Sequence, residues 1–118
     1  MNLLVVDSTG LATDVLLRAI KAGHSVKWFM PKHEGERLPV GDGLVDRVDD
    51  WEKHVDWADF IWTADNLNDM EKITKYKKKG YPVYGPDSES AKLELDRNYG
   101  QDVLKKAGVK IMPYEGPF

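Results

Sequence analysis

The sequence predicts an open, mostly parallel, Rossmann-like α/β sheet with helices on both faces. Strand-like apolar runs alternate with helical patterns along all 118 residues, as in chains built from βαβ units. Residues 2–6 are continuously apolar after Asn2, as a parallel strand buried on both faces should be. Residues 11–20 follow with apolar side chains at helical spacing. A chain of this length fits one domain.

The remaining elements follow in order. Strands are expected at 2–6, 25–30, 45–48, 59–63 and 81–84, with helices at 11–22, 51–57 and 69–79. Gly23 and Gly80 end two of these helices, and Asn68 is expected to cap the third. The four tryptophans, at 28, 51, 57 and 62, are expected in the core. A short and a longer helix follow the last strand, and residues 109–114 predict one more strand.

Composition excludes several classes of protein. The net charge of −3 argues against nucleic-acid binding, which needs a basic face. No apolar run approaches the roughly 20 residues that span a bilayer, and no signal peptide opens the chain. With no cysteine and no ligand spacing among its three histidines, the chain predicts no disulfide and no metal site. The expected location is cytoplasmic, without membrane contact.

In such sheets, ligands bind outside the carboxyl ends of the strands, where the strand order reverses. Loops 7–10, 31–44, 64–68 and 85–88 are expected there, and loop 31–44 is unusually long. Ser8, Thr9 and Gly10 precede a helix N-terminus, where free N–H groups favour an anion such as phosphate. The alternative is that Ser8 or Thr9 simply caps the helix. The loop has one glycine, short of the G-x-G-x-x-G fingerprint of dinucleotide sites.

Two further loops carry candidate residues. Asp65 and Asn66 could hydrogen-bond a ribose or an amine, although both are also common turn formers. At residues 85–86, a Gly-Pro pair makes a sharp corner between strand and helix, and Asp87 or Ser88 can cap that helix. The predicted substrate contacts, to phosphate or ribose, are Ser8, Thr9, Gly10, Asp65, Asn66, Gly85 and Pro86.

Residues 81–114 resemble the junction between the N-terminal domain and the ATP-grasp body of phosphoribosylamine–glycine ligases. Gly85-Pro86 agrees with the corner of that family, and residues 91–94, Ala-Lys-Leu-Glu, agree with its A-x-L-E helix. The family then has G-S-K-A-F-A-K, whose first lysine reaches nucleotide phosphate. Arg97 lies in that slot, where it could hold phosphate through two hydrogen bonds, and Gln101 replaces the second lysine.

Outside residues 81–114, the chain matches the family's motifs at only a few positions. Of the family's G-S-G-G-R-E-H-A loop, Ser8 and Gly10 are present, whereas its arginine, glutamate and histidine are absent. Residues 63–67 replace its V-G-P-E-A-P-L segment and lack the Gly-Pro pair.

The resemblance implies the N-terminal substrate-binding domain of a carboxylate–amine ligase. In that family ATP phosphorylates glycine, and the amine of 5-phosphoribosylamine attacks the acyl phosphate to form glycinamide ribonucleotide, ADP and phosphate. The resemblance implies ATP and Mg²⁺ in the full-length enzyme, neither bound by residues 1–118 alone, and no catalytic residue here. It implies a small-molecule substrate and, as partner, an ATP-grasp body of the same chain, reached through a connection that begins at about residues 109–118.

Other functions stay open at this point. A flavodoxin-like module would bind a nucleotide such as NAD or FMN. A non-catalytic regulatory domain would use loop 31–44 to contact a protein. A diverged ligase would join another amine or acid.

Overall fold

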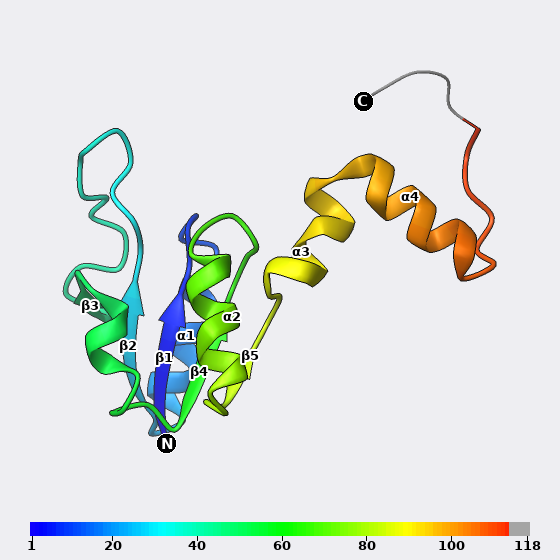
Figure 1. Cartoon of the computed structure of the whole chain (residues 1–118). Helices are drawn as coiled ribbons and strands as arrows, with labels where there is room; N and C mark the ends of the chain where they lie inside the picture. Colours follow the sequence, from blue (N-terminus) through cyan, green and yellow to red (C-terminus); the bar gives the residue numbers. More distant parts are fainter. Residues whose placement is uncertain (114–118) are drawn as a thin grey trace.

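The computed structural model describes residues 1–113 as an open sheet of five strands in the order β3-β2-β1-β4-β5, all parallel (Figure 1). The strands are β1 (Asn2–Val6), β2 (Ser25–Phe29), β3 (Asp46–Val48), β4 (Phe60–Thr63) and β5 (Val83–Tyr84). The helices are α1 (Thr13–Lys21), the short 3₁₀ helix η1 (Trp51–His54), α2 (Met70–Lys78), α3 (Ser88–Leu95) and α4 (Arg97–Lys106). The predicted fold class is therefore confirmed.

The two faces of the sheet bury separate apolar cores because successive side chains of a strand point in opposite directions. On one face, Val5 of β1 packs with Leu16 of α1 and Trp28 of β2. On the other face, Leu4 packs with Ile73 of α2 and with η1. Figure 1 shows α1 behind the sheet and α2 in front of it. Helices thus cover both faces, as the sequence predicts.

The tryptophans belong to these cores, as expected. Trp28 is fully buried on the α1 face, and Trp51 is buried on the α2 face. Trp62 and Trp57 are partly buried and pack against the first and the second core, respectively. Burying two indole rings fully and two in part supplies much apolar contact area in so small a sheet.

One predicted helix cap is wrong. Asn68 does not cap α2; the N-cap position belongs to Asp69, which has left-handed backbone angles (φ 57°) and makes no side-chain cap bond. The Asp69 carboxylate instead accepts a hydrogen bond from Nε1 of the buried Trp51 (2.9 Å). This hydrogen bond satisfies the indole N–H of a buried ring, and it takes up the carboxylate that could have capped the helix. Asn68 donates to Ser8 Oγ.

The predicted strand at 109–114 is also not found: residues 109–113 have no strand conformation, and residue 114 lies outside the described residues. No neighbouring strand pairs with this segment among residues 1–113, and an extended segment forms a strand only with a partner. The expected strand at 81–84 is shortened to Val83–Tyr84 for a similar reason, since its pairing with β4 begins at Val83.

Helices α3 and α4 lead away from the sheet as an arm (Figure 1). The radius of gyration is 16.7 Å, against about 13–14 Å for a compact domain of this length. The two helices pack closely on each other at Gly100 of α4, where a β-carbon would clash with the backbone carbonyl of Leu93 in α3. The arm therefore has its own internal packing and adds little to the two cores of the sheet.

Candidate functional site

The site predicted from the sequence lies where the strand order reverses. From β1 the chain moves outward through β2 and β3, then returns to the other side of β1 as β4 and β5. The loops that follow β1 and β4 therefore lie next to each other at the carboxyl edge of the sheet. This is the usual position of ligand sites in open parallel sheets.

The loop after β1 is organised by Asp7, a side chain with no exposed surface. Its Oδ1 accepts hydrogen bonds from the backbone N–H of Thr9 (3.0 Å), the Thr9 hydroxyl (3.1 Å) and the N–H of Gly10 (3.1 Å). Its Oδ2 accepts from the N–H of Ala12 (3.1 Å), the N-cap residue of α1. The N–H groups that we expected to be free for an external anion thus already bind a carboxylate.

Asp65 joins this loop to the loop after β4. Its carboxylate accepts the backbone N–H of Ser8 (2.5 Å), the Ser8 hydroxyl (3.0 Å) and the N–H of Leu67 (2.9 Å). Asn68 completes the link by donating to Ser8 Oγ (2.7 Å). Neither Ser8 nor Thr9 makes a side-chain cap bond to α1, so the simple capping alternative is not what the structure shows.

A hollow of about 580 Å³ lies beside these loops, between the carboxyl edge of the sheet and helix α3. Asn66, in its wall, donates to the Glu94 carboxylate of α3 (2.7 Å), which ties the loop after β4 to the arm. The polar residues that line the hollow are Thr9, Asp65, Asn66, Ser90 and Glu94. Its apolar lining residues include Leu11, Leu67, Pro86 and Leu93. Of the described residues that line the hollow, none is basic and two are acidic, which favours amines and hydroxyl groups over phosphate.

The Gly85-Pro86 corner forms as predicted. Gly85 has φ 129°, and a β-carbon there would overlap Thr63 Oγ1 and lie 2.6 Å from the Thr63 carbonyl oxygen. Glycine is therefore needed both for the backbone angle and for the close approach to β4. Pro86 lines the hollow, whereas Gly85 contacts β4.

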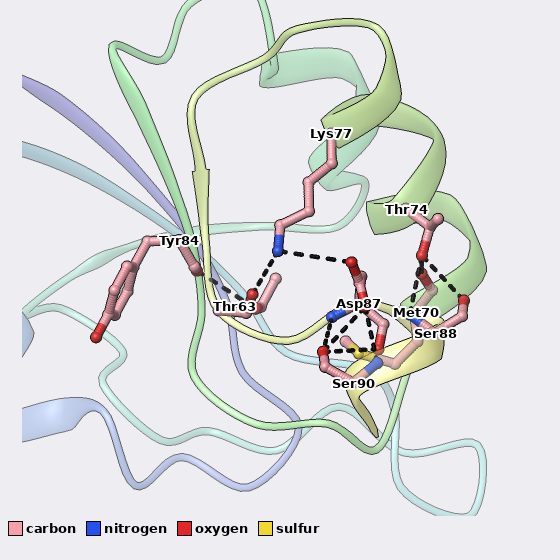
Figure 2. Close-up of polar contacts among 9 residues, drawn as sticks. Thr63, Met70, Thr74, Lys77, Tyr84, Asp87, Ser88 and Ser90 are labelled. Atoms are coloured by element: carbon pink, nitrogen blue, oxygen red, sulfur yellow. Dashed lines mark hydrogen bonds and ion pairs between the residues drawn. The ribbon is translucent and has the colours of Figure 1, made fainter. Parts of the chain in front are cut away.

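Figure 2 shows how side chains of α2 hold this corner. Lys77 Nζ donates to the carbonyl of Gly85 (2.7 Å) and lies 4.0 Å from the Asp87 carboxylate. One turn earlier, the Thr74 hydroxyl accepts the N–H of Ser88 (2.9 Å) and contacts the Ser88 hydroxyl (3.0 Å). The start of the arm is thus bonded to the helix that precedes β5.

Asp87 caps α3, as predicted. It forms a capping box with Ser90: the Asp87 carboxylate accepts the Ser90 N–H (2.9 Å), and the Ser90 hydroxyl accepts the Asp87 N–H (2.9 Å). The bond from the Ser90 backbone, a second that the Ser90 hydroxyl donates to the same carboxylate (2.9 Å), and the nearby charge of Lys77 hold the pKa of Asp87 below its usual value.

Arg97 does not join the other predicted residues. It is the first residue of α4 and lines a different hollow of about 310 Å³, together with Gln101, Leu104 and Lys110. The residue equivalent to the second family lysine, Gln101, shares that hollow, so these two candidate positions lie together on the arm.

Asp7 is the residue that the sequence analysis missed. The available signal was a carboxylate directly after a buried strand and two residues before Thr9, since aspartate side chains commonly accept N–H groups two residues on. Among residues 1–113, no group of three or more His, Asp or Glu side chains is placed to hold a metal ion. No helix in the same part of the chain is long and apolar enough to cross a membrane.

The architecture and its edge site define an open parallel α/β domain of the kind that binds a ligand at its switch point. No family model and no curated protein matches the sequence. Among solved structures, the chain is similar to the crystal structure of N5-carboxyaminoimidazole ribonucleotide synthetase from Thermotoga maritima, with a TM-score of 0.75 and 19% sequence identity. The match covers 97% of this chain and 33% of that chain, so this chain spans about a third of the synthetase.

At this identity, the likeness shows a shared fold. It extends over the sheet and the arm together, because nearly the whole chain is covered. The matched enzyme is a synthetase other than the ligase whose motifs residues 81–114 resemble, so the comparison shows the fold and does not identify the reaction.

Proposed function

We propose that this chain is the N-terminal substrate-binding domain of an ATP-dependent ligase that joins a carboxylate to an amine. The observation that carries the proposal is the fold match: the sheet and its helical arm together correspond to a third of a ribonucleotide synthetase. The motifs at the Gly85-Pro86 corner and at residues 91–94 point to the same class of enzyme. The particular reaction proposed is that of phosphoribosylamine–glycine ligase, in purine biosynthesis, or of a close relative in the cytoplasm.

The proposed substrate site is the hollow at the carboxyl edge. Thr9, Asp65, Asn66 and Pro86 line it, while Ser8, Gly10 and Gly85 shape the loops around it. Its volume of about 580 Å³ falls within the roughly 300–1,000 Å³ of small-molecule sites. The carboxylate of Asp65 and the amide of Asn66 would hydrogen-bond the amine or the ribose hydroxyls of the substrate.

The chemical step would take place outside this domain. ATP and Mg²⁺ are assigned to an ATP-grasp body of the full-length enzyme, with Arg97 of the arm contacting nucleotide phosphate. The arm exposes the apolar side chains of Leu93, Leu95 and Leu104, and the segment after it exposes Met112; a packed neighbour would cover them. These residues support a contact between the arm and an ATP-grasp body. The connection to that body is proposed to begin at about residue 109.

The test compares residues 1–118 with the full-length product of the gene. We expect the full-length protein, but not residues 1–118, to release ADP in the presence of ATP, glycine and an amine substrate. Asp65→Ala should raise KM for the amine substrate in the full-length protein, whereas Asp102→Ala, an exposed position of α4, should leave it unchanged. ADP release by residues 1–118 alone, or a reading frame that ends after codon 118, would contradict the proposal and favour a regulatory or interaction domain.

A dinucleotide- or flavin-binding module has less support. Such a module binds phosphate through free N–H groups in the loop after β1, and in this chain those groups are bonded to Asp7 and Asp65. Saturable binding of NAD or FMN to residues 1–118 would favour that function over the one proposed.

A further inference from the structure

The loop after β1 contains an anion of its own. The Asp7 side chain is fully buried, and its two carboxylate oxygens accept four hydrogen bonds from Thr9, Gly10 and Ala12. Three of the four donors are backbone N–H groups of the segment that leads into α1: Thr9 and Gly10 lie in the loop, and Ala12 is the N-cap residue. A phosphate bound in a loop that leads into a helix N-terminus would use N–H groups of this kind.

The neighbouring loop is satisfied in the same way. The backbone N–H groups of Ser8 and Leu67 both donate to the carboxylate of Asp65. Two side-chain carboxylates therefore take up five backbone N–H groups from the two loops at the switch point. A second anion placed here would find these donors occupied, and it would lie close to two carboxylates that repel it.

The hollow beside the loops has matching chemistry. Its charged lining residues are the acids Asp65 and Glu94, and the hydroxyl of Thr9 is already donated to Asp7. The hollow thus offers mainly acceptors, which suit amine and hydroxyl donors of a ligand.

We propose that Asp7 is a specificity-determining residue: its buried carboxylate occupies the anion position at the start of α1 and keeps a ligand phosphate out of this loop. A sugar-phosphate substrate would then present its amine and hydroxyl groups to Asp65 and Asn66 and carry its phosphate elsewhere. The inference rests on the proposed function for the identity of the substrate site, but the occupation of the anion position does not depend on which reaction is catalysed.

The test titrates inorganic phosphate into ¹⁵N-labelled residues 1–118 and follows the backbone amide signals, with chloride at matched ionic strength as the salt control. We expect no saturable shift of the Thr9, Gly10 and Ala12 signals in the unmodified chain. In Asp7→Gly and Asp7→Ser, which empty the anion position, the same three signals should shift saturably, with an apparent affinity about tenfold or more above the lower limit that the titration sets for the unmodified chain.

Asp14→Ser is the matched control. It removes the same charge from an exposed position of α1, where the carboxylate pairs with Arg18 one turn along the helix, so it should gain no phosphate binding at these amides. A loss of stability alone would not move these signals on phosphate addition, so the readout separates specificity from a structural role. If a variant is unfolded without phosphate, folding on addition of phosphate but not chloride is the expected result.

Two results would overturn the inference: saturable phosphate shifts of these amides in the unmodified chain, or folded Asp7 variants that gain none. If both variants stay unfolded even with phosphate, the titration of the unmodified chain still tests the inference, because saturable shifts of its Thr9, Gly10 and Ala12 amides would overturn it. Titration with ribose 5-phosphate tests the proposed function separately. Shifts at Asp65 and Asn66 without shifts at Thr9, Gly10 and Ala12 support both; an absence of any shift counts against the substrate site alone.

Discussion

The carboxylate of Asp65 accepts hydrogen bonds from both the backbone N–H and the hydroxyl of Ser8, a residue 57 positions earlier in the chain. This pair bonds the loop after β1 to the loop after β4, at the edge where ligands bind in such sheets. Because Ser8 also accepts from Asn68, one serine connects the two loops through both its donor and its acceptor.

This link predicts an energetic coupling. Asp65→Ala and Ser8→Ala should each destabilise the chain, and the double variant should lose less than the sum of the two, with a coupling of about 0.5–1.5 kcal/mol. Urea unfolding of the four proteins measures it. Thr9→Ala is the control partner, because its hydroxyl donates to Asp7 and not to Asp65; its cost should add to that of Asp65→Ala. Additive Ser8 and Asp65 effects would show that the bond contributes nothing.

A second prediction concerns the corner between β5 and α3. Gly85→Ala should destabilise the chain by about 1–3 kcal/mol more than Gly80→Ala, because the new methyl group would overlap Thr63 as well as strain the backbone. Gly80 also has positive φ (90°) but has open space around it, so its substitution costs about 1–2 kcal/mol from the backbone alone. Thermal or urea unfolding distinguishes them. Equal losses would mean that the contact with Thr63 relaxes freely.

The Asp87 cap predicts a dependence on pH. Asp87→Ala should cost about 1 kcal/mol at neutral pH, and Asp87→Asn, which keeps an acceptor, should cost less. Since the folded-state pKa of Asp87 lies below the ordinary value of 3.8, the charged cap stabilises the fold above that value. Its contribution is lost as the pH falls from about 4 through the folded-state pKa. Urea unfolding of the unmodified chain and Asp87→Ala at pH 7 and pH 3 should show the difference shrinking; a constant difference would contradict the assignment.

Lys77 predicts a matched pair of substitutions on α2. Lys77→Met should destabilise the chain by about 1–2 kcal/mol, because it removes a charged hydrogen bond to the Gly85 carbonyl. Lys78→Met, at the exposed neighbouring position, should change stability by less than about 0.5 kcal/mol. In Lys77→Met the pKa of Asp87 should also rise toward its ordinary value, which NMR titration of the Asp87 carboxyl carbon measures. An unchanged pKa would separate Lys77 from the cap.

The alternation of elements could be predicted because it depends on local patterns. A continuous apolar run predicted β1, and apolar spacing predicted α1, both within a few residues of their observed bounds. The corner after β5 could also be predicted from the sequence, since Gly85 permits and Pro86 fixes particular backbone angles whatever surrounds them. The Asp87 cap is local too: it joins residues three positions apart.

The chemistry of the loops was less predictable because side chains there have several partners within reach. Asp69 would cap α2 if helix ends were isolated, but the buried indole of Trp51 takes its carboxylate. Ser8 and Thr9 were predicted to be helix caps or phosphate ligands. In the fold their hydroxyl groups donate to the carboxylates of Asp65 and Asp7, respectively. In each case the hydrogen bond goes to a carboxylate that the fold brings close, and proximity in space, not local sequence, determined the partner.

The sequence by itself therefore determined the class of fold, the order of its elements and the sharp corner that starts the arm, because these follow from backbone restrictions and the period of apolar side chains. Only the tertiary structure decided that Asp65 reaches Ser8 from the loop after the neighbouring strand, that Asp7 binds the N–H groups that lead into α1, and that Arg97 lies apart from the other predicted residues. Those outcomes depend on which strands become neighbours, and strand order comes from packing over the whole chain.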